Sequence, residues 1–382
     1  MAKRAVLVGC NYPGCVHELR GCVNDVVRMH QSLIQRFGFR EQDITIMIDT
    51  DDSYLQPTGA NIKGALNQMI AKSEDGDVLF FHYSGHGMRA PAQIDDDDET
   101  GYDECIVPCD MNFITDDDFR ELISKLPSGV ALTIVSDSCH SGGLIEAAKE
   151  QIGDSHNPQG KPEADPLQFG EANSGDEENE ERSAGTKQVV YVGEDGMEVR
   201  SKALPLDTYM EMLRDRTGRQ DIEVGSIRRT LYDIFREDSS SKVKKFLRER
   251  SAVDEEESVL NSAADDGDAC VQAAMETGLR YATEAAYAGP GKTVTSMGVL
   301  VSGCQSHQTS ADAANPNGDP ADAFGALSNA IQTIFASTEA GGQPISNRYL
   351  VTEVRRLLAS QGYTQQPGLY CTDENAEAPF IC

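Results

Sequence analysis

The chain has 382 residues, with 33 Lys and Arg against 63 Asp and Glu, and its net charge at pH 7 is −30. This length is enough for a sizeable core and for more than one folding unit. So acidic a chain repels nucleic-acid phosphates and anionic membranes and favours cationic substrates or metal ions. We therefore expect neither a nucleic-acid nor a membrane partner.

The first 150 residues alternate between buried strands and amphipathic helices. Apolar runs of strand length occur at Ala5–Val8, Ile44–Ile48, Val78–Tyr83 and Ala131–Val135. Helical apolar stripes lie between these runs, one after an expected cap at Thr58 and one that begins with a capping box at Thr115. Strands that alternate with crossover helices predict an α/β fold with a mostly parallel sheet flanked by helices.

The start of the chain has only a short apolar run, which indicates a strand and not a signal peptide. No run approaches the roughly 20 apolar residues that a membrane span needs. The ten cysteines show no C-x-x-C spacing, so we expect reduced thiols and no zinc site. These features predict a cytoplasmic protein, with entry into the nucleus as the alternative.

The composition changes abruptly after residue 150 and divides the chain into four regions. Residues 1–150 form the first ordered region, and residues 151–203 are so rich in acids and small polar residues that they predict a flexible linker. A partial helical pattern with another acidic run predicts a loosely packed insertion over 204–296. Residues 297–382 return to a strand and amphipathic helices, which we expect to complete the fold of the first region.

Two strand ends run directly into glycine-rich turns around a reactive side chain. The first is His82–Gly87 and the second is Ser136–Gly143. Reaction sites of open α/β sheets lie beyond the carboxyl ends of strands. A thiol needs a neighbouring imidazole to become a useful nucleophile at neutral pH, so Cys139 and His86 are the expected nucleophile and base. The backbone amides of Gly87 and Cys139 are the expected donors to an oxyanion.

Each of these side chains also has a purely structural interpretation, because a Cys in a strand-to-helix turn or a His after a strand often only packs. The order and spacing favour catalysis, since His86 precedes Cys139 by 53 residues and a separation of about 50 is typical of caspases. His140 ranks second as a base, because it is adjacent to the thiol and is expected to point away. His82 lies within the strand and is expected to pack.

Four motifs together resemble the metacaspases: HYSGHG at 82–87, DSCHSG at 137–142, GCVNDV at 21–26 and DECIVPCD at 103–110. The acidic linker and the tail from Gln365 to Cys382 resemble the type II metacaspases of plants and green algae. The resemblance covers residues 1–150 and about 297–382 well. It implies a caspase-like fold, cleavage after Arg or Lys, activation by Ca²⁺, and a zymogen that cuts its own linker.

We therefore expect a calcium-activated cysteine endopeptidase that acts on proteins as a monomer. The resemblance also implies a role in programmed cell death or stress responses. The resemblance makes Cys22, Asp25, Ser84 and Asp137 the pocket for the basic side chain before the scissile bond. Two carboxylates in a closed pocket prefer a guanidinium or ammonium group over a neutral one. For Asp25 alone, a charge on a helix surface is the alternative.

The linker contains few basic residues that such a pocket could accept. We expect self-cleavage after Arg200 first and after Lys202 second, because both precede the point where order returns.

Calcium ligands are expected in two places. The acidic run contributes Asp96, Asp97, Asp98 and Glu99, because hard carboxylate oxygens suit Ca²⁺. Asp116 and Asp117 resemble calcium ligands of the wider family. A solvated charge run explains the first set equally well, and interaction with a helix dipole explains the second.

Two other functions remain open at this stage. One is a calcium-responsive scaffold that keeps the fold without peptidase activity, which the intact His86 and Cys139 oppose. The other is a protease of the same clan that is directed to Asn or Asp. A pocket lined by Asp25 and Asp137 would repel Asp and gain little from Asn.

Overall fold

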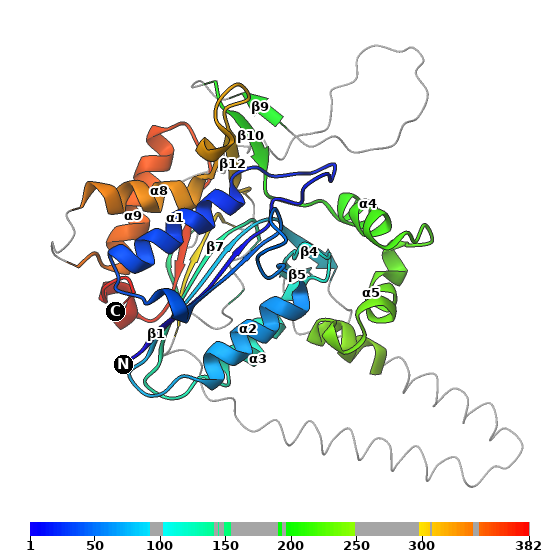
Figure 1. Cartoon of the computed structure of the whole chain (residues 1–382), viewed down its shortest axis with the longest axis horizontal. Helices are drawn as coiled ribbons and strands as arrows, with labels where there is room; N and C mark the ends of the chain where they lie inside the picture. Colours follow the sequence, from blue (N-terminus) through cyan, green and yellow to red (C-terminus); the bar gives the residue numbers. More distant parts are fainter. Residues whose placement is uncertain are drawn as a thin grey trace, which may run out of the picture.

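The computed structural model describes residues 1–91, 102–140, 144, 149–153, 190–192, 196–248, 298–305, 308–338 and 344–381. Its central feature is a seven-stranded sheet in the order β2-β1-β3-β7-β11-β14-β8 (Figure 1). Strands β2, β1, β3, β7 and β11 pair in parallel, whereas β14 and β8 pair antiparallel at one side. The predicted α/β fold with a mostly parallel sheet is therefore confirmed.

The strands of this sheet are β1 (Lys3–Gly9), β2 (Ile44–Ile48), β3 (Val78–Ser84), β7 (Ala131–Asp137), β8 (Glu150–Ile152), β11 (Gly298–Ser302) and β14 (Gly368–Tyr370). Two smaller sheets contain β4 (Gly87–Pro91), β5 (Tyr102–Ile106) and β6 (Ile114–Thr115), and β9 (Val190–Val192), β10 (Glu198–Ser201), β12 (Ala311–Ala314) and β13 (Phe324–Gly325). The longer central strands are almost continuously apolar because both of their faces are covered.

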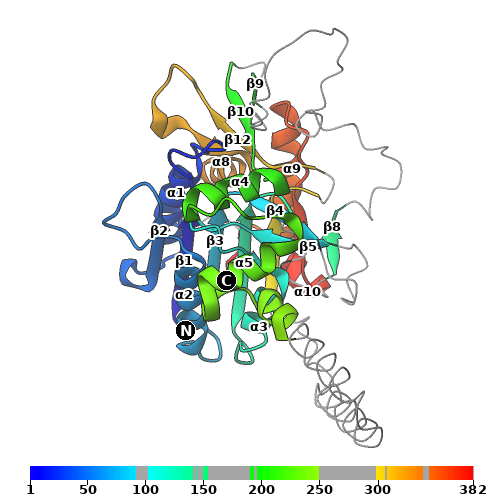
Figure 2. The same ribbon diagram turned by 90° about the vertical axis from the view of Figure 1, so that its right-hand side faces the viewer.

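The helices are α1 (Cys22–Gln35), α2 (Gly59–Ala71), α3 (Asp116–Ile123), α4 (Leu206–Thr217), α5 (Ile227–Phe235), α8 (Ala326–Ser337), α9 (Asn347–Ser360) and α10 (Asp373–Glu377). Residues 241–248 are also helical. Helices α1, α8 and α9 cover one face of the sheet, and α2 and α3, with α4 and α5 further out, lie on the other (Figures 1 and 2). Each face thus has its own apolar core.

The local signals at the helix ends act as the sequence predicts. The Thr58 side chain accepts a hydrogen bond from Asn61 N and caps α2. Thr115 and Asp118 form the predicted capping box of α3. These caps satisfy amides that have no partner within the helix.

Residues 204–248, the part of the predicted insertion that the structure describes, pack more closely than a loose insertion. Tyr209 of α4 and Leu231 of α5 are buried in the same apolar core as α2 and α3. The charged residues that surround these two side chains hide the apolar face in the sequence pattern. The end of the predicted linker is also ordered, since β10 pairs with β12 in the smaller sheet. Its middle, 154–189, lies outside the described residues.

None of the helices in the described residues has the length and apolar character needed to span a bilayer. All eight cysteines within the described ranges are free thiols.

Candidate active site

Parallel pairing of β3 with β7 brings the two predicted reactive turns together. Ser84 pairs with Asp137 at the end of both strands, so His86 and Cys139 leave the sheet at the same edge. The approach is very close at Gly87, where an added Cβ would lie 1.8 Å from the Cys139 carbonyl oxygen. Only glycine leaves room for this contact, which explains the glycine that follows His86.

The chain around Lys202 runs through this edge in an extended form. Its amide donates a hydrogen bond to Ser310 O at 2.9 Å. Its carbonyl oxygen accepts one from the Gly87 amide at 3.0 Å and lies 3.1 Å from His86 Nδ1. The Leu204 amide donates to Gly87 O at 2.9 Å. The carbonyl of the Lys202–Ala203 bond therefore faces both His86 and one of the two expected oxyanion donors.

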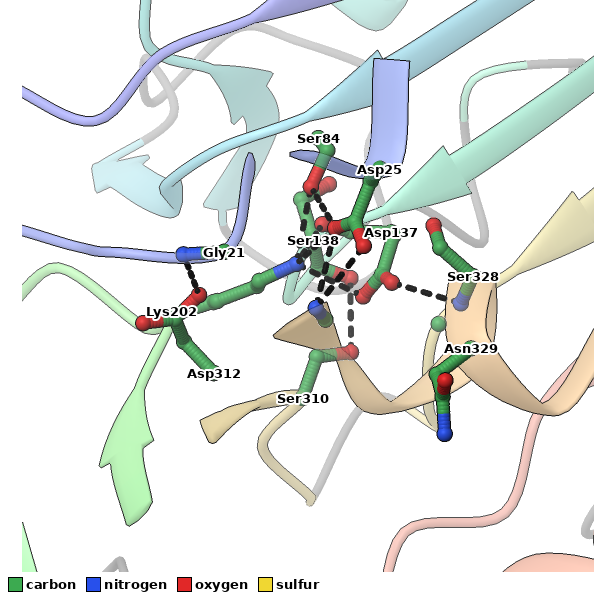
Figure 3. Close-up of polar contacts among 12 residues, drawn as sticks. Gly21, Asp25, Ser84, Asp137, Ser138, Lys202, Ser310, Asp312, Ser328 and Asn329 are labelled. Atoms are coloured by element: carbon green, nitrogen blue, oxygen red, sulfur yellow. Dashed lines mark hydrogen bonds and ion pairs between the residues drawn. The ribbon is translucent and has the colours of Figure 1, made fainter. Parts of the chain in front are cut away.

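The side chain of Lys202 fills the predicted acidic pocket (Figure 3). Its Nζ lies 2.9 Å from Asp137 Oδ1 and 3.8 Å from Asp25 Oδ2, and the two carboxylates and the lysine are at most 1% exposed. The same Nζ donates to Ser84 Oγ at 3.0 Å and to Asp137 O at 3.1 Å. The pocket thus receives an ammonium group through charge and directed hydrogen bonds together.

The C-terminal region positions these two carboxylates. Asp25 accepts a hydrogen bond from Gly325 N at 2.9 Å, and Asp137 accepts one from Ser328 N at 2.8 Å. Gly325 is needed here because an added Cβ would lie 2.3 Å from both Asp137 Oδ2 and Lys202 Nζ. Residues far apart in the sequence therefore build one pocket.

The other predicted pocket residue, Cys22, is fully buried at this site. Burial raises the pKa of its thiol, and the nearby charge of Lys202 opposes that rise.

Burial also controls the protonation of Cys139 and His86. It raises the pKa of Cys139 well above its ordinary value and lowers the pKa of His86 to about 4. The thiol and the imidazole are therefore both neutral while Lys202 lies in the pocket. The thiol sulfur accepts a hydrogen bond from Ser310 N at 2.9 Å, which holds it in place.

The charges in the pocket reinforce one another. Burial alone would lower the pKa of Lys202, but the negative charges of Asp137 and Asp25 raise it above its ordinary value. Burial raises the pKa of Asp25, and the charge of Lys202 opposes this effect. Buried Lys202 and the two carboxylates stay charged only because each compensates the charge of the other.

The pocket receives Lys202 and not Arg200, which the sequence ranks first for self-cleavage. The Arg200 guanidinium lies outside it, where Nη1 donates to Glu18 O at 2.6 Å and Nη2 lies 3.7 Å from Glu198. The register of β10 on β12, in which Arg200 pairs with Asp312, carries the chain past the site so that Lys202 reaches the pocket.

Two residues of the site escaped the sequence analysis. Ser310 contacts the sulfur of Cys139, and the carboxylate of Asp312 accepts hydrogen bonds from the Arg20 and Gly21 amides at 2.8 Å each. Asp312 had a sequence signal, because it is the one charged residue among the alanines of β12, and the structure shows that it is fully buried.

His82 packs as expected, with its Nε2 3.1 Å from Ser328 Oγ.

Of the expected calcium ligands, the structure describes Asp116 and Asp117. Asp96, Asp97, Asp98 and Glu99 lie outside the described residues. Asp116 and Asp117 lie 3.3 and 3.7 Å from Lys242 Nζ, which also contacts Asp103 at 2.5 Å. Within the described ranges, no group of three His, Cys, Asp or Glu side chains is arranged to hold a metal ion. The carboxylates of Asp116 and Asp117 instead surround an ammonium group.

Comparisons with known proteins find relatives over the full length of the chain. The family model described as "Metacaspase, peptidase C14 domain" matches residues 3–148. The chain is 46% identical to Metacaspase-4 of Arabidopsis thaliana over 424 residues and 47% identical to Metacaspase-6 of the same plant over 394 residues, and each alignment covers all of both chains. A crystal structure of a Geobacter sulfurreducens protein has a TM-score of 0.52 at 16% identity, covers 100% of this chain and 98% of that one, and supports the fold alone.

Proposed function

Because the chain belongs to the metacaspase family of cysteine peptidases, we propose that it is an endopeptidase that cleaves proteins after Lys or Arg, with Cys139 as nucleophile and His86 as base. The full-length likeness to plant relatives fits the type II arrangement. One observation carries the proposal. Lys202 occupies the Asp25–Asp137 pocket while its carbonyl group faces His86 and the Gly87 amide.

The proposal gives each group a role. A substrate takes the place of Lys202, and its basic side chain pairs with Asp25 and Asp137. His86 takes the proton of the Cys139 thiol, and the sulfur attacks the scissile carbonyl while the Gly87 amide stabilises the oxyanion. The imidazolium returns the proton to the leaving amine and leaves a thioester. Water, deprotonated by His86, then hydrolyses the thioester and regenerates the thiol.

We further propose that the intact chain is a zymogen that cuts its own Lys202–Ala203 bond. The buried lysine excludes other substrates from the pocket at a high effective concentration. Both sides of the bond are held by backbone hydrogen bonds, as a substrate would be.

Calcium activation remains a prediction, and no catalytic step is assigned to the ion. The proposal also includes a monomeric protein in the cytoplasm and, by family likeness, a role in programmed cell death or stress responses. Light scattering and cell fractionation test the first two of these.

The decisive experiment compares the purified wild type with Cys139→Ala and with Cys371→Ala, which removes a buried thiol of the chain outside the site. Peptides that end in Arg, Lys, Asn or Asp are tested with Ca²⁺ or with a chelator. We expect Cys139→Ala to be inactive and Cys371→Ala to match the wild type on Arg and Lys peptides. Turnover by Cys139→Ala would refute the dyad, and a preference for Asn or Asp would refute the pocket.

A further inference from the structure

Two buried tyrosines surround the backbone of His86, and sequence motifs assign neither of them a role. Tyr12 follows β1 and Tyr83 lies in β3, and both are fully buried. Their hydroxyl oxygens lie 3.1 Å apart. The Tyr12 ring also lies against the His86 imidazole, with the ring centres 4.7 Å apart at an angle of 31°.

The two hydroxyls hold the peptide groups on both sides of His86. The His86 amide donates to Tyr12 Oη at 2.9 Å, and Tyr12 Oη in turn donates to Val107 O at 2.5 Å. Tyr83 Oη donates to His86 O at 2.8 Å. The Val107 amide donates to the same carbonyl at 3.0 Å. These buried hydrogen bonds leave the His86 backbone little freedom to rotate.

The carbonyl that Tyr83 binds belongs to the peptide group whose other end is the Gly87 amide. That amide donates to Lys202 O at 3.0 Å. Because a peptide group is planar, a hydrogen bond that fixes its carbonyl also fixes the direction of its N–H. Tyr83 therefore orients the expected oxyanion donor, although it does not touch the substrate.

The surrounding sequence is fitted to this arrangement. Tyr12 has a φ of 53°, in the left-handed region that non-glycine residues rarely adopt. Asp49 holds it there by accepting hydrogen bonds from the Asn11 and Tyr12 amides at 2.9 and 2.7 Å. An added Cβ at Gly85 would lie 2.5 Å from Tyr83 Oη and 2.9 Å from Tyr12 Oη. The strained backbone of Tyr12 and the glycine at position 85 both allow the two hydroxyls to contact the His86 backbone.

We propose that Tyr12 and Tyr83 are positioning residues of the peptidase: Tyr12 fixes the backbone amide of His86 and so the residue that carries the imidazole, and Tyr83 fixes the peptide group that presents the Gly87 amide to the oxyanion. This inference rests on the proposed dyad of Cys139 and His86. It adds two side chains that determine the rate without contacting the substrate.

The test uses Tyr12→Phe and Tyr83→Phe in the full chain, since both keep the ring and remove the hydroxyl. The matched control is Tyr209→Phe, because Tyr209 is also fully buried and its hydroxyl donates to Met111 O at 2.6 Å, outside the site. For each protein we would measure kcat and KM on a Lys peptide, thermal unfolding, and the pH dependence of Cys139 alkylation by iodoacetamide.

Loss of a direct oxyanion donor costs about 100-fold to 1,000-fold in kcat, so loss of its positioning by Tyr83→Phe should cost about tenfold, with KM unchanged. Tyr12→Phe should lower kcat about fivefold and shift the pH profile of alkylation, because the His86 amide loses its acceptor and the residue that carries the imidazole is held less firmly. Tyr209→Phe should change only the unfolding temperature.

The inference is wrong if both variants keep kcat within about twofold of the wild type, or if their activity falls only with the folded fraction. If either variant does not fold, Gly85→Ala tests the same contact from the backbone side and should also lower kcat. Cys139→Ala distinguishes a failure of the proposed dyad from a failure of the positioning role. An active Cys139→Ala refutes the dyad itself, whereas an inactive Cys139→Ala beside fully active Tyr12→Phe and Tyr83→Phe refutes only the positioning role.

Discussion

Two lysines from the segment after residue 195 insert among carboxylates of the first region, yet their surroundings differ. Lys202 is fully buried between Asp25 and Asp137, beside backbone that contacts His86. Lys242 is 8% exposed and contacts Asp103 and two half-buried carboxylates of α3. The same ion-pair chemistry thus serves two purposes. The first lysine occupies the proposed substrate pocket, whereas the second joins its segment to carboxylates of the first region.

The largest expected effect follows from removing a carboxylate of the Lys202 pocket. Asp25→Asn should lower kcat/KM for Lys and Arg peptides about 1,000-fold, because loss of one partner of a buried charge pair costs about 2–5 kcal/mol. Steady-state kinetics on the processed enzyme measure this. Asp233→Asn removes a more exposed carboxylate of α5 and should leave kcat/KM unchanged. Equal loss in both variants would mean that Asp25 acts on general stability and not on substrate binding.

The second expected effect concerns the first cut. Lys202→Met keeps the length of the side chain but gives the acidic pocket no cation, so cleavage of the 202–203 bond should slow at least about 100-fold. Gel analysis and N-terminal sequencing of fragments measure this. Lys202→Arg should restore the cut, and Lys242→Met should not prevent it. A new terminus at Ala203 that appears in Lys202→Met at the wild-type rate would contradict the assignment.

This contrast also shows how far the sequence could predict the site. The strand ends and glycine-rich turns locate His86 and Cys139, because strand periodicity and turn chemistry are local signals. The choice between Arg200 and Lys202 is not local. It depends on the register of β10 against β12, a pairing between segments more than 100 residues apart. For the same reason Lys242 reads as an ordinary charge on a helix, since its carboxylate partners lie far away in the sequence.

The third prediction addresses Lys242. Lys242→Met in the Cys139→Ala protein should lower the free energy of unfolding by about 3 kcal/mol, because it leaves the buried carboxylate of Asp103 with one cation fewer. Chemical denaturation measures the change. Lys244→Met, on the same helical segment, should change it by about 0.5 kcal/mol or less. Equal effects of the two substitutions would show that Lys242 does not anchor its segment.

The fourth prediction is that the stability of the protein depends on pH through Asp116, which lies beside Lys242. Burial raises the pKa of Asp116 to about 6, so between about pH 4 and pH 6 the folded protein binds more protons at this residue than the unfolded chain does. Its contribution to stability therefore falls as pH rises through that window. Relative to Asp116→Asn, the wild type should lose about 2 kcal/mol between pH 4 and pH 6. Denaturation curves at the two pH values test this, and a constant difference between the proteins would contradict it.

The smallest expected effect is that of Arg200→Ala on self-cleavage. Arg200 lies outside the acidic pocket and contacts Glu18 O and Glu198 at the surface of the smaller sheet. Its loss removes a partly exposed ion pair, a type that contributes about 1 kcal/mol or less. The 202–203 bond should therefore be cut at a rate within about fivefold of the wild type, with Ala203 still the new N-terminus. Time courses with N-terminal sequencing measure both quantities. A fragment that begins at Ser201 in the wild type and disappears in Arg200→Ala would show that Arg200 enters the pocket. The pocket would then not distinguish Arg200 from Lys202.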